Sequence, residues 1–169
     1  NFSADRVPVS LGIALDCSGS MTAEKVETAR AAIERLITKL LDEDDELFFM
    51  EFATRARLIQ GWTTDRRLIS DALRRVAPVG GTALYDAVAE ALPTAEEGRN
   101  RKKALLVISD GNDTNSSIGV TSLRQRIRES EVLVYALGVD SNSKDAPRIL
   151  QPVPPTIPFP FPGGGRRQP

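Results

Sequence analysis

The stretch that decides the fold is VSLGIALDCSGS, residues 9–20. Its first seven residues form an apolar run, which predicts a central strand buried on both faces of a sheet. The run ends at Asp16, and the polar residues 16–20 follow it at once. Open α/β sheets bind ligands beyond the carboxyl ends of their strands. The same short stretch therefore predicts a fold class and the place of a site.

Downstream of this strand, helical and strand patterns alternate. Apolar positions recur at helical spacing over residues 22–41, and an aromatic-rich apolar run over residues 47–52 predicts a second buried strand. Residues 56–60 follow so closely that they should pair with that strand as a hairpin. The later predicted elements are a helix from Thr64 or Asp65 to Val76, a helix over residues 82–92, a strand over 104–108, a helix around 123–127 and a strand over 132–139.

This order, β-α-β-β-α-α-β-α-β, predicts an α/β fold that is doubly wound and Rossmann-like. A mainly parallel central sheet with one antiparallel edge strand should carry helices on both faces. At 169 residues the chain suits one domain and is too short for two ordinary ones. We expect an N-terminal arm over residues 1–6, the domain over 7–150 and a Pro/Gly-rich linker or insert over 151–169.

Composition narrows the function. The 22 basic and 23 acidic residues are interspersed, so no strong field favours nucleic acid or an anionic membrane. No apolar run approaches the roughly 20 residues that span a bilayer, so we expect no direct membrane insertion. The chain has no histidine and one cysteine, Cys17, so zinc, copper, haem and His-based catalysis lack their usual residues. Any metal here must be a hard ion bound by oxygen atoms.

Three polar clusters fall where predicted strands end or a predicted helix begins. They contain the candidate metal ligands Asp16, Ser18, Ser20, Thr82 and Asp110. If the first and fourth strands are neighbours, the two aspartates lie side by side at one edge of the sheet. Two carboxylates and three hydroxyls suit a small hard cation, with Mg²⁺ the best fit and Mn²⁺ or Ca²⁺ the alternatives. Neutral hydroxyl ligands would leave that ion attractive to an incoming anion.

The three clusters together resemble the von Willebrand factor type A (VWA) family. Residues 16–20 (DCSGS) match its DxSxS signature, residues 81–86 (GTALYD) look like its threonine loop, and residues 109–111 (SDG) resemble its second aspartate. DxSxS alone is a weak signal, but the three motifs occur in the family's order and on the expected elements. The resemblance covers roughly residues 7–140.

The resemblance implies a metal-ion-dependent adhesion site (MIDAS) in a non-catalytic, adhesion-type protein-binding module. By that resemblance Ser18 and Ser20 bind the metal directly, Thr82 binds it directly when a ligand is present, and Asp16 and Asp110 act largely through water or by hydrogen bonding. A glutamate or aspartate of a protein partner would complete the metal's shell. We expect the partner to touch the site at Gly19, Gly81 and Asn112.

The sequence departs from the family pattern after the fifth predicted strand. A further helix and edge strand are usual, whereas only residues 146–150 precede the prolines here. Either the domain is truncated, or its last elements lie beyond Pro169. In both cases the fifth strand is expected to have an unpaired edge, which favours self-association.

Two other function classes compete with the binding module. The alternative is a Mg²⁺-dependent phosphohydrolase, since such enzymes also carry aspartates at strand ends of doubly wound sheets. Their mechanism requires a second carboxylate where Ser18 stands and a lysine near the phosphate. The surroundings of Asp110 are expected to lack that lysine, because Lys102 and Lys103 lie at the wrong end of their strand. A third reading is an assembly part whose metal site has lapsed, which the intact five-residue set disfavours.

Simpler structural roles stand beside these functional ones. Asp16 and Ser18 are candidate caps of the first helix, and Thr82 is a candidate cap of the helix that follows it. Asp86 is interpreted as a helix-start charge, and Asp113 similarly. We interpret residues 42–46 as a solvated turn, Cys17 as a small buried side chain, and Trp62 as a packing residue.

The first residue and the glycosylation triplets bear on the compartment and the source. The chain begins with Asn1 rather than Met, which favours a mature form or an excerpt and, with it, a secreted chain in an extracellular or periplasmic setting. Glycosylation triplets begin at Asn1, Asn112 and Asn115. Sugars on Asn112 or Asn115 would crowd the loop that carries Asp110, so we interpret the triplets as chance and expect a bacterial or otherwise unglycosylated source.

Overall fold

The computed structural model describes residues 6–111 and 113–139. Five strands form one sheet with the order β3-β2-β1-β4-β5. All neighbours are parallel except β2 and β3, so the predicted fold class and element order are confirmed. The elements are β1 (Val9–Asp16), α1 (Ala23–Lys39), β2 (Glu46–Phe52), β3 (Ala56–Thr63), α2 (Arg66–Arg74), α3 (Leu84–Glu96), β4 (Lys102–Ser109), α4 (Val120–Glu129) and β5 (Leu133–Gly138).

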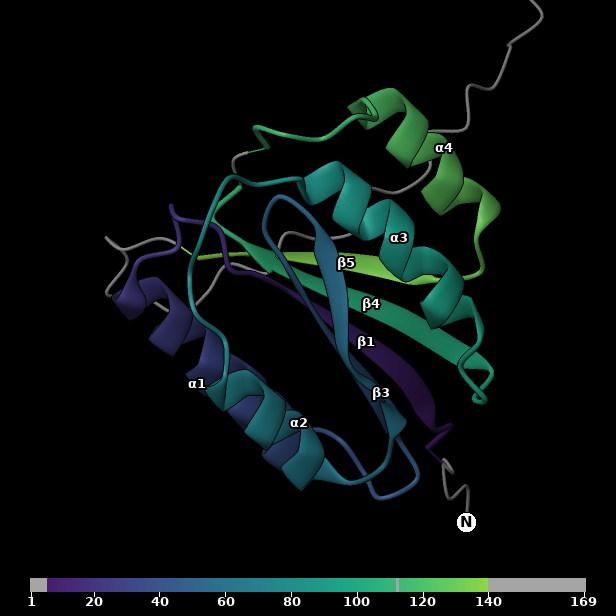
Figure 1. Ribbon diagram of the computed structural model, residues 1–169. Coiled ribbons are helices and arrows are strands. Elements are labelled where there is room, and N and C mark those ends of the chain that lie inside the picture. Colours follow the sequence, from purple (N-terminus) through teal and green to yellow (C-terminus); the bar gives the residue numbers. More distant parts are fainter. Residues whose placement is uncertain (1–5, 112, 140–169) are drawn as a thin grey trace, which may run out of the picture.

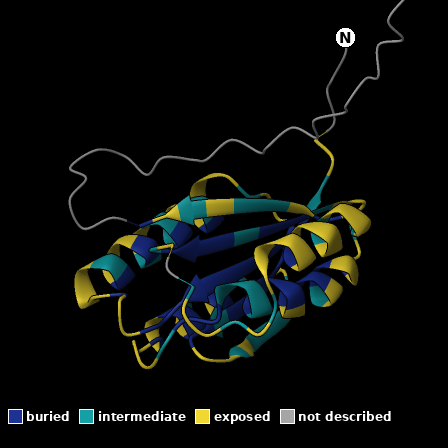
Figure 2. Ribbon diagram, turned by 90° about the horizontal axis from the view of Figure 1, so that it is seen from above, coloured by how far each residue is buried: buried dark blue, intermediate teal, exposed yellow. Residues whose placement is uncertain are grey.

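Helices cover both faces of the sheet: α1 and α2 lie on one face, and α3 and α4 on the other (Figure 1). Each face has its own apolar core, because successive side chains of a strand point to opposite faces. In β2, Leu47 and Phe49 pack toward α1 and α2, whereas Phe48 and Phe52 pack toward α3. The central strands β1, β2 and β4 are mostly buried, whereas the edge strands β3 and β5 and the outer faces of the helices are partly or fully exposed (Figure 2).

A glycine in the central strand leaves room for an aromatic pair that packs against the sheet. A Cβ on Gly12 would lie 2.3 Å from the Phe48 ring. That ring meets Trp62 edge-on, with centroids 4.8 Å apart and an interplanar angle of 88°. The indole N–H of Trp62 donates to the carbonyl of Thr94 at 3.1 Å. Trp62 is therefore a packing residue, as expected.

Element ends differ from the predicted ones where tertiary contacts decide them. α2 ends at Arg74 although the apolar pattern continues to Val76. The guanidinium of Arg30 on α1 donates to the carbonyls of Leu73 at 2.9 Å and Val76 at 2.7 Å. An arginine from another helix thus satisfies carbonyls that the last turn leaves open.

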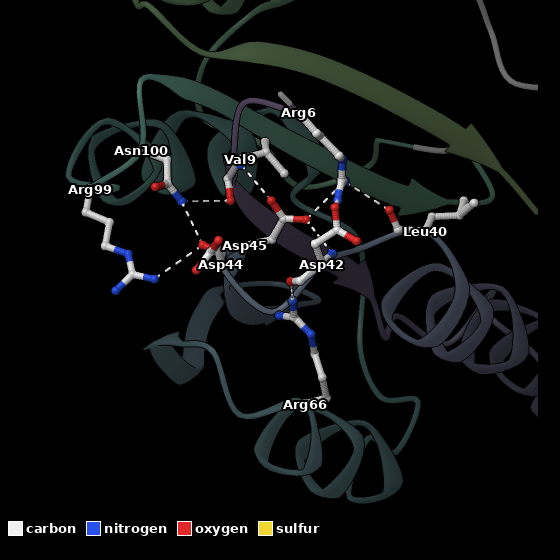
Figure 3. A network of polar contacts seen from close by, with 9 residues as sticks. All are labelled: Arg6, Val9, Leu40, Asp42, Asp44, Asp45, Arg66, Arg99 and Asn100. Atoms are coloured by element: carbon white, nitrogen blue, oxygen red, sulfur yellow. Dashed lines mark hydrogen bonds and ion pairs between the residues drawn. The ribbon is translucent and has the colours of Figure 1, made fainter. Parts of the chain in front are cut away.

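The acidic turn before β2 is not merely solvated, which corrects the interpretation of residues 42–46. The Asp45 side chain is fully buried and accepts from the backbone N–H groups of Val9 at 2.7 Å and Asp42 at 2.8 Å. Arg6 pairs with it at 3.0 Å and also binds Asp42. Figure 3 shows this network tying the start of β1 to the turn, with Arg66 donating to the Asp42 carbonyl. The turn pattern alone gave no sign of this burial.

Strand β5 ends the sheet within the part of the chain that the structure describes. There it pairs with β4 alone, and Leu133 is exposed. Self-association through this edge stays a prediction. Residues 146–150, the proline-rich stretch and Asn112 lie outside the described residues. Of the helices in the described ranges, none has the length and apolar character needed to cross a membrane.

Candidate metal-binding site

Three loops meet at the carboxyl edge of the sheet: the β1 loop (residues 17–22), the glycine loop (residues 79–83) and the β4 loop (residues 110–119). The first two are joined by backbone hydrogen bonds. Gly19 N–H donates to the Gly80 carbonyl at 2.8 Å, and Val79 N–H donates to the Cys17 carbonyl at 2.7 Å. The DxSxS segment and the segment leading to Thr82 are therefore held side by side.

Asp16 joins β1 to β4 from a fully buried position. One carboxylate oxygen accepts from Ser18 N–H at 2.8 Å, and the other accepts from the Ser109 hydroxyl at 2.6 Å. Leu15 is paired with Ile108 across the sheet, so Asp110 extends one residue further past the edge than Asp16. The two predicted aspartates thus lie at the carboxyl ends of adjacent strands, as expected: Asp16 ends β1, and Asp110 follows Ser109, which ends β4.

Two serine hydroxyls converge in the β1 loop. The Oγ atoms of Ser18 and Ser20 lie 3.0 Å apart. Ser18 is buried and Ser20 is exposed, so the pair reaches from the protein interior to the surface. The two serines of the DxSxS motif, both candidate ligands, therefore bring their hydroxyls together.

Helix capping does not explain these residues. The N-cap of α1 is Thr22, whose hydroxyl accepts from Lys25 N–H at 3.3 Å. The N-cap of α3 is Ala83, one residue after Thr82. Asp16, Ser18 and Thr82 are therefore not the caps of these helices.

Thr82 is buried and anchored to the β4 loop through its backbone. Its carbonyl accepts from the N–H groups of Thr114 and Asn115, both at 2.9 Å, and its N–H donates to the Thr114 hydroxyl at 3.1 Å. The position of Thr82 relative to the β4 loop is thus fixed by its own main-chain groups, whatever the rotamer of its side chain.

The start of α3 is capped from a distance. The helix has no side-chain cap of its own, and Asp113 of the β4 loop accepts from Leu84 N–H at 2.8 Å. The Ser116 hydroxyl accepts from the N–H groups of Tyr85 at 2.9 Å and Asp86 at 3.1 Å. Asp113 therefore caps α3 although it lies 29 residues after Leu84 in the sequence. Sequence reasoning missed this role, although the polar run after Asp110 was a usable signal.

Asp86 returns the contact. Its carboxylate accepts from Ser117 N–H at 2.8 Å and Ile118 N–H at 3.1 Å. Mainly because Ser117 N–H donates to it, the pKa of Asp86 lies below its usual value. Asp86 is thus more than a helix-start charge: with Asp113 and Ser116 it forms a clamp, the α3 clamp, that locks the β4 loop onto the helix beside Thr82.

We expect Asp86→Asn to lower the free energy of unfolding by about 1 kcal/mol at neutral pH, because one charge-assisted acceptor is lost. The lowered pKa means that ionised Asp86 stabilises the fold above its unfolded pKa of about 3.9 and ceases to do so as the pH falls through its folded pKa. The difference from wild type should therefore shrink below about pH 4. Urea unfolding at both pH values measures it. The matched control is Glu90→Gln on the exposed side of α3, and a pH-independent gap would contradict the assignment.

Glycines allow the loops to approach so closely. Gly80 has φ of +80°, a conformation that L side chains rarely adopt. A Cβ on Gly81 would lie 2.1 Å from the Asn115 side-chain oxygen, and one on Gly19 would lie 3.2 Å from the Gly80 carbonyl. These contacts give Gly19 and Gly81 a structural reason independent of any partner. The third predicted partner contact, Asn112, lies outside the described residues.

A lysine reaches the site from α1. The Lys25 ammonium lies 3.0 Å from Asp110 Oδ2 and 3.2 Å from the Ser20 carbonyl. The expectation that no lysine surrounds Asp110 is therefore wrong. The sequence distance of 85 residues hid the contact, because a helix running back along the sheet brings its first turn to the end of β4.

Cys17 is an interior residue, as expected. Its thiol donates to the Phe52 carbonyl at 3.2 Å. Burial, together with the negative charges of Glu51 and Asp16, raises the pKa of the Cys17 thiol to about 12. A reactive thiolate is therefore disfavoured at this position.

The donor set at this edge consists of oxygens. Across residues 6–111 and 113–139, no group of three or more Asp, Glu, His or Cys side chains is placed to hold a metal ion. A cation held by these loops would thus depend on hydroxyl oxygens as well as the two carboxylates. Hydrogen bonds join the glycine loop to the β1 loop and to the β4 loop. The bonds of Ser109 to Asp16 and of Lys25 to Asp110 tie the ends of β1 and β4 and the start of α1 together, so the five predicted residues lie on one connected framework.

Comparisons with known proteins agree with the fold. The sequence matches the von Willebrand factor type A domain over residues 11–112. An uncharacterized protein of Synechocystis sp. is 31% identical over 137 residues, 79% of this chain and 32% of the relative. The chain thus spans about a third of that curated relative.

Several solved structures share the architecture. An aerotolerance-related membrane protein from Bacteroides fragilis is 25% identical with a TM-score of 0.68, over 86% of this chain and 79% of that chain. The hypothetical protein BatB from Bacteroides thetaiotaomicron is 25% identical with a TM-score of 0.66, over 83% and 75%. The type V pili tip protein Mfa5 from Porphyromonas gingivalis is 19% identical with a TM-score of 0.60, over 68% and 22%.

Proposed function

Because this chain belongs to the von Willebrand factor type A family, we propose that it is a non-catalytic protein-binding module of the adhesion type. In this proposal Asp16, Ser18, Ser20, Thr82 and Asp110 hold Mg²⁺, and a protein partner presents an aspartate or glutamate to it. A type V pili tip protein shares the fold, which is compatible with an adhesion-type role for this chain. The family accounts for the fold, and the geometry of the site supports the binding of a cation by oxygen ligands.

The observation that carries the proposal is the pair of serine hydroxyls 3.0 Å apart beside the buried Asp16 carboxylate. A hard cation prefers a compact set of oxygen ligands and retains waters readily. Neither serine is a helix cap, and the β1 loop that carries them is hydrogen-bonded to the glycine loop, which contains Thr82. The residues present therefore fit Mg²⁺, with Mn²⁺ or Ca²⁺ as substitutes.

The protein's own groups prepare the site for an anion. Asp16 directs its two oxygens to Ser18 and Ser109, so it orients the loop as well as contributing charge. Ser20 is exposed, which leaves the outer side of the site open to a partner. The bound cation would supply a Lewis-acidic position for the partner's carboxylate oxygen. Specificity for acidic partners follows from that charge.

Calorimetric titration with MgCl₂ tests the proposal. We expect wild type to bind one Mg²⁺ and Ser20→Ala to bind it at least about tenfold more weakly, because a neutral ligand is lost from an exposed position. The matched control is Ser122→Ala, an exposed serine on α4. Wild type that binds no divalent cation, or Ser20→Ala that binds as wild type does, overturns the assignment. A pull-down with and without chelator then tests whether partner capture depends on the metal.

One observation favours a second candidate. Lys25 beside Asp110 supplies the lysine that a Mg²⁺-dependent phosphohydrolase needs. The carboxylate that such an enzyme also requires is still missing, because Ser18 occupies its place. An assay with a generic phosphate ester separates the two functions. Turnover that disappears in Asp16→Ala would reverse the ranking.

A further inference from the structure

Lys25 occupies an unfavourable place for a cation. It is the third residue of α1, where the N–H groups of the first turn and the helix dipole favour negative charge. A residue that breaks a local rule of this kind is expected to have a compensating partner elsewhere. That partner is Asp110, at the end of β4.

The ion pair is largely withdrawn from water. The side chain of Lys25 is 16% exposed and that of Asp110 is 4% exposed. The ammonium is 3.0 Å from Asp110 Oδ2 and 3.2 Å from the carbonyl of Ser20, so it contacts two of the residues proposed to surround the metal. A charge pair at this depth interacts more strongly than one on the surface, because water screens it less.

We infer that Lys25 is the built-in counter-ion of the metal-free site and competes with the divalent cation for Asp110. This inference rests on the proposed function. Without Lys25, the two aspartates would place two negative charges at the carboxyl edge of the sheet. Lys25 balances the charge of Asp110 before any metal binds. A divalent cation that enters must either displace the ammonium or bind beside it, and repulsion opposes both. Lys25 therefore lowers metal affinity while stabilising the protein without metal.

The inference predicts two opposite effects of removing the charge. Lys25→Gln, which keeps a hydrogen-bond donor toward Ser20 and Asp110, should bind Mg²⁺ about tenfold more tightly than wild type. Without metal the same variant should melt at a lower temperature, because a buried carboxylate loses its ion pair. Saturating Mg²⁺ should restore most of that loss. A residue with a merely structural role would lower stability and leave or weaken metal affinity, so the tighter binding is diagnostic.

Calorimetric titration with MgCl₂ and thermal melting with and without Mg²⁺ test it on the full chain. Lys39→Gln, at the exposed last turn of the same helix, is the matched control for the change in net charge. Lys25→Met provides a second charge-removing variant. If either Lys25 variant folds only when Mg²⁺ is present, that result supports the inference, because the metal then replaces the missing counter-ion.

The outcomes separate this inference from the proposed function. If Ser20→Ala loses Mg²⁺ while both Lys25 variants bind it as wild type does, the competition is overturned and the binding module stands. Weaker binding by both Lys25 variants also overturns it, since Lys25 then assists the metal. If neither wild type nor any Lys25 variant binds Mg²⁺, both ideas are overturned.

Discussion

We expect Asp16→Ala to abolish measurable Mg²⁺ binding and, with it, metal-dependent partner capture. The carboxylate contributes one of two negative charges at the site and orients the Ser18 backbone at 2.8 Å. A hard divalent ion depends on such charge, so its loss should weaken affinity by several orders of magnitude, beyond the range of calorimetric titration. Titration with MgCl₂ at high protein concentration measures this.

The substitution should also lower stability. Asp16 is fully buried, and its removal leaves the Ser109 hydroxyl and the Ser18 N–H without their acceptor. We expect a loss of about 1–3 kcal/mol in the free energy of unfolding, so folding must be checked by circular dichroism. Asp16→Asn, which keeps an acceptor of the same shape, is the control that separates lost charge from lost structure. Full metal affinity in a folded Asp16→Ala protein would refute the site.

The second large effect is expected at Asp45, which lies beside the amino ends of β1 and β2. Asp45→Ala should lower the free energy of unfolding by about 2–4 kcal/mol. The buried carboxylate accepts from two backbone N–H groups and pairs with Arg6, and alanine satisfies none of them. Urea unfolding followed by tryptophan fluorescence measures the loss.

Its control is the neighbouring residue. Asp44 carries the same charge, but its side chain is exposed, and its contacts to Arg99 and Asn100 come from the backbone carbonyl (Figure 3). Asp44→Ala should therefore change stability by less than about 0.5 kcal/mol. Equal losses for both variants would show that net charge, rather than the buried network, stabilises the turn.

Much of the fold could be predicted because its signals are local. Local patterns, such as the apolar run before Asp16 and the helical spacing after Thr22, predicted the order of all nine described elements. The hairpin of β2 and β3 followed from the short connection between them. Element ends were less predictable, since the contacts that set them, such as Arg30 on the end of α2, join segments far apart in the sequence.

The same difference between local signals and contacts far apart in the sequence decided which parts of the site could be predicted. The DxSxS motif named Ser18 and Ser20 as candidates, whose hydroxyls the structure brings together, and the strand order placed Asp16 and Asp110 at one edge. Three features depended on tertiary structure alone: the Lys25 contact, the α3 clamp and the burial of Asp45. The sequence does not distinguish a polar side chain that faces water from one that accepts from a backbone N–H group far along the chain.

The position of Arg6 has a practical consequence for measuring binding. Arg6 is fixed beside the beginning of β1, whereas the serine pair follows its end, so the eight-residue strand separates them. At roughly 3.3 Å per residue this strand is about 26 Å long. A tag that precedes Arg6 and attaches the protein to a sensor chip should therefore leave the hydroxyl-lined edge turned toward the solution, accessible to an analyte in the flow.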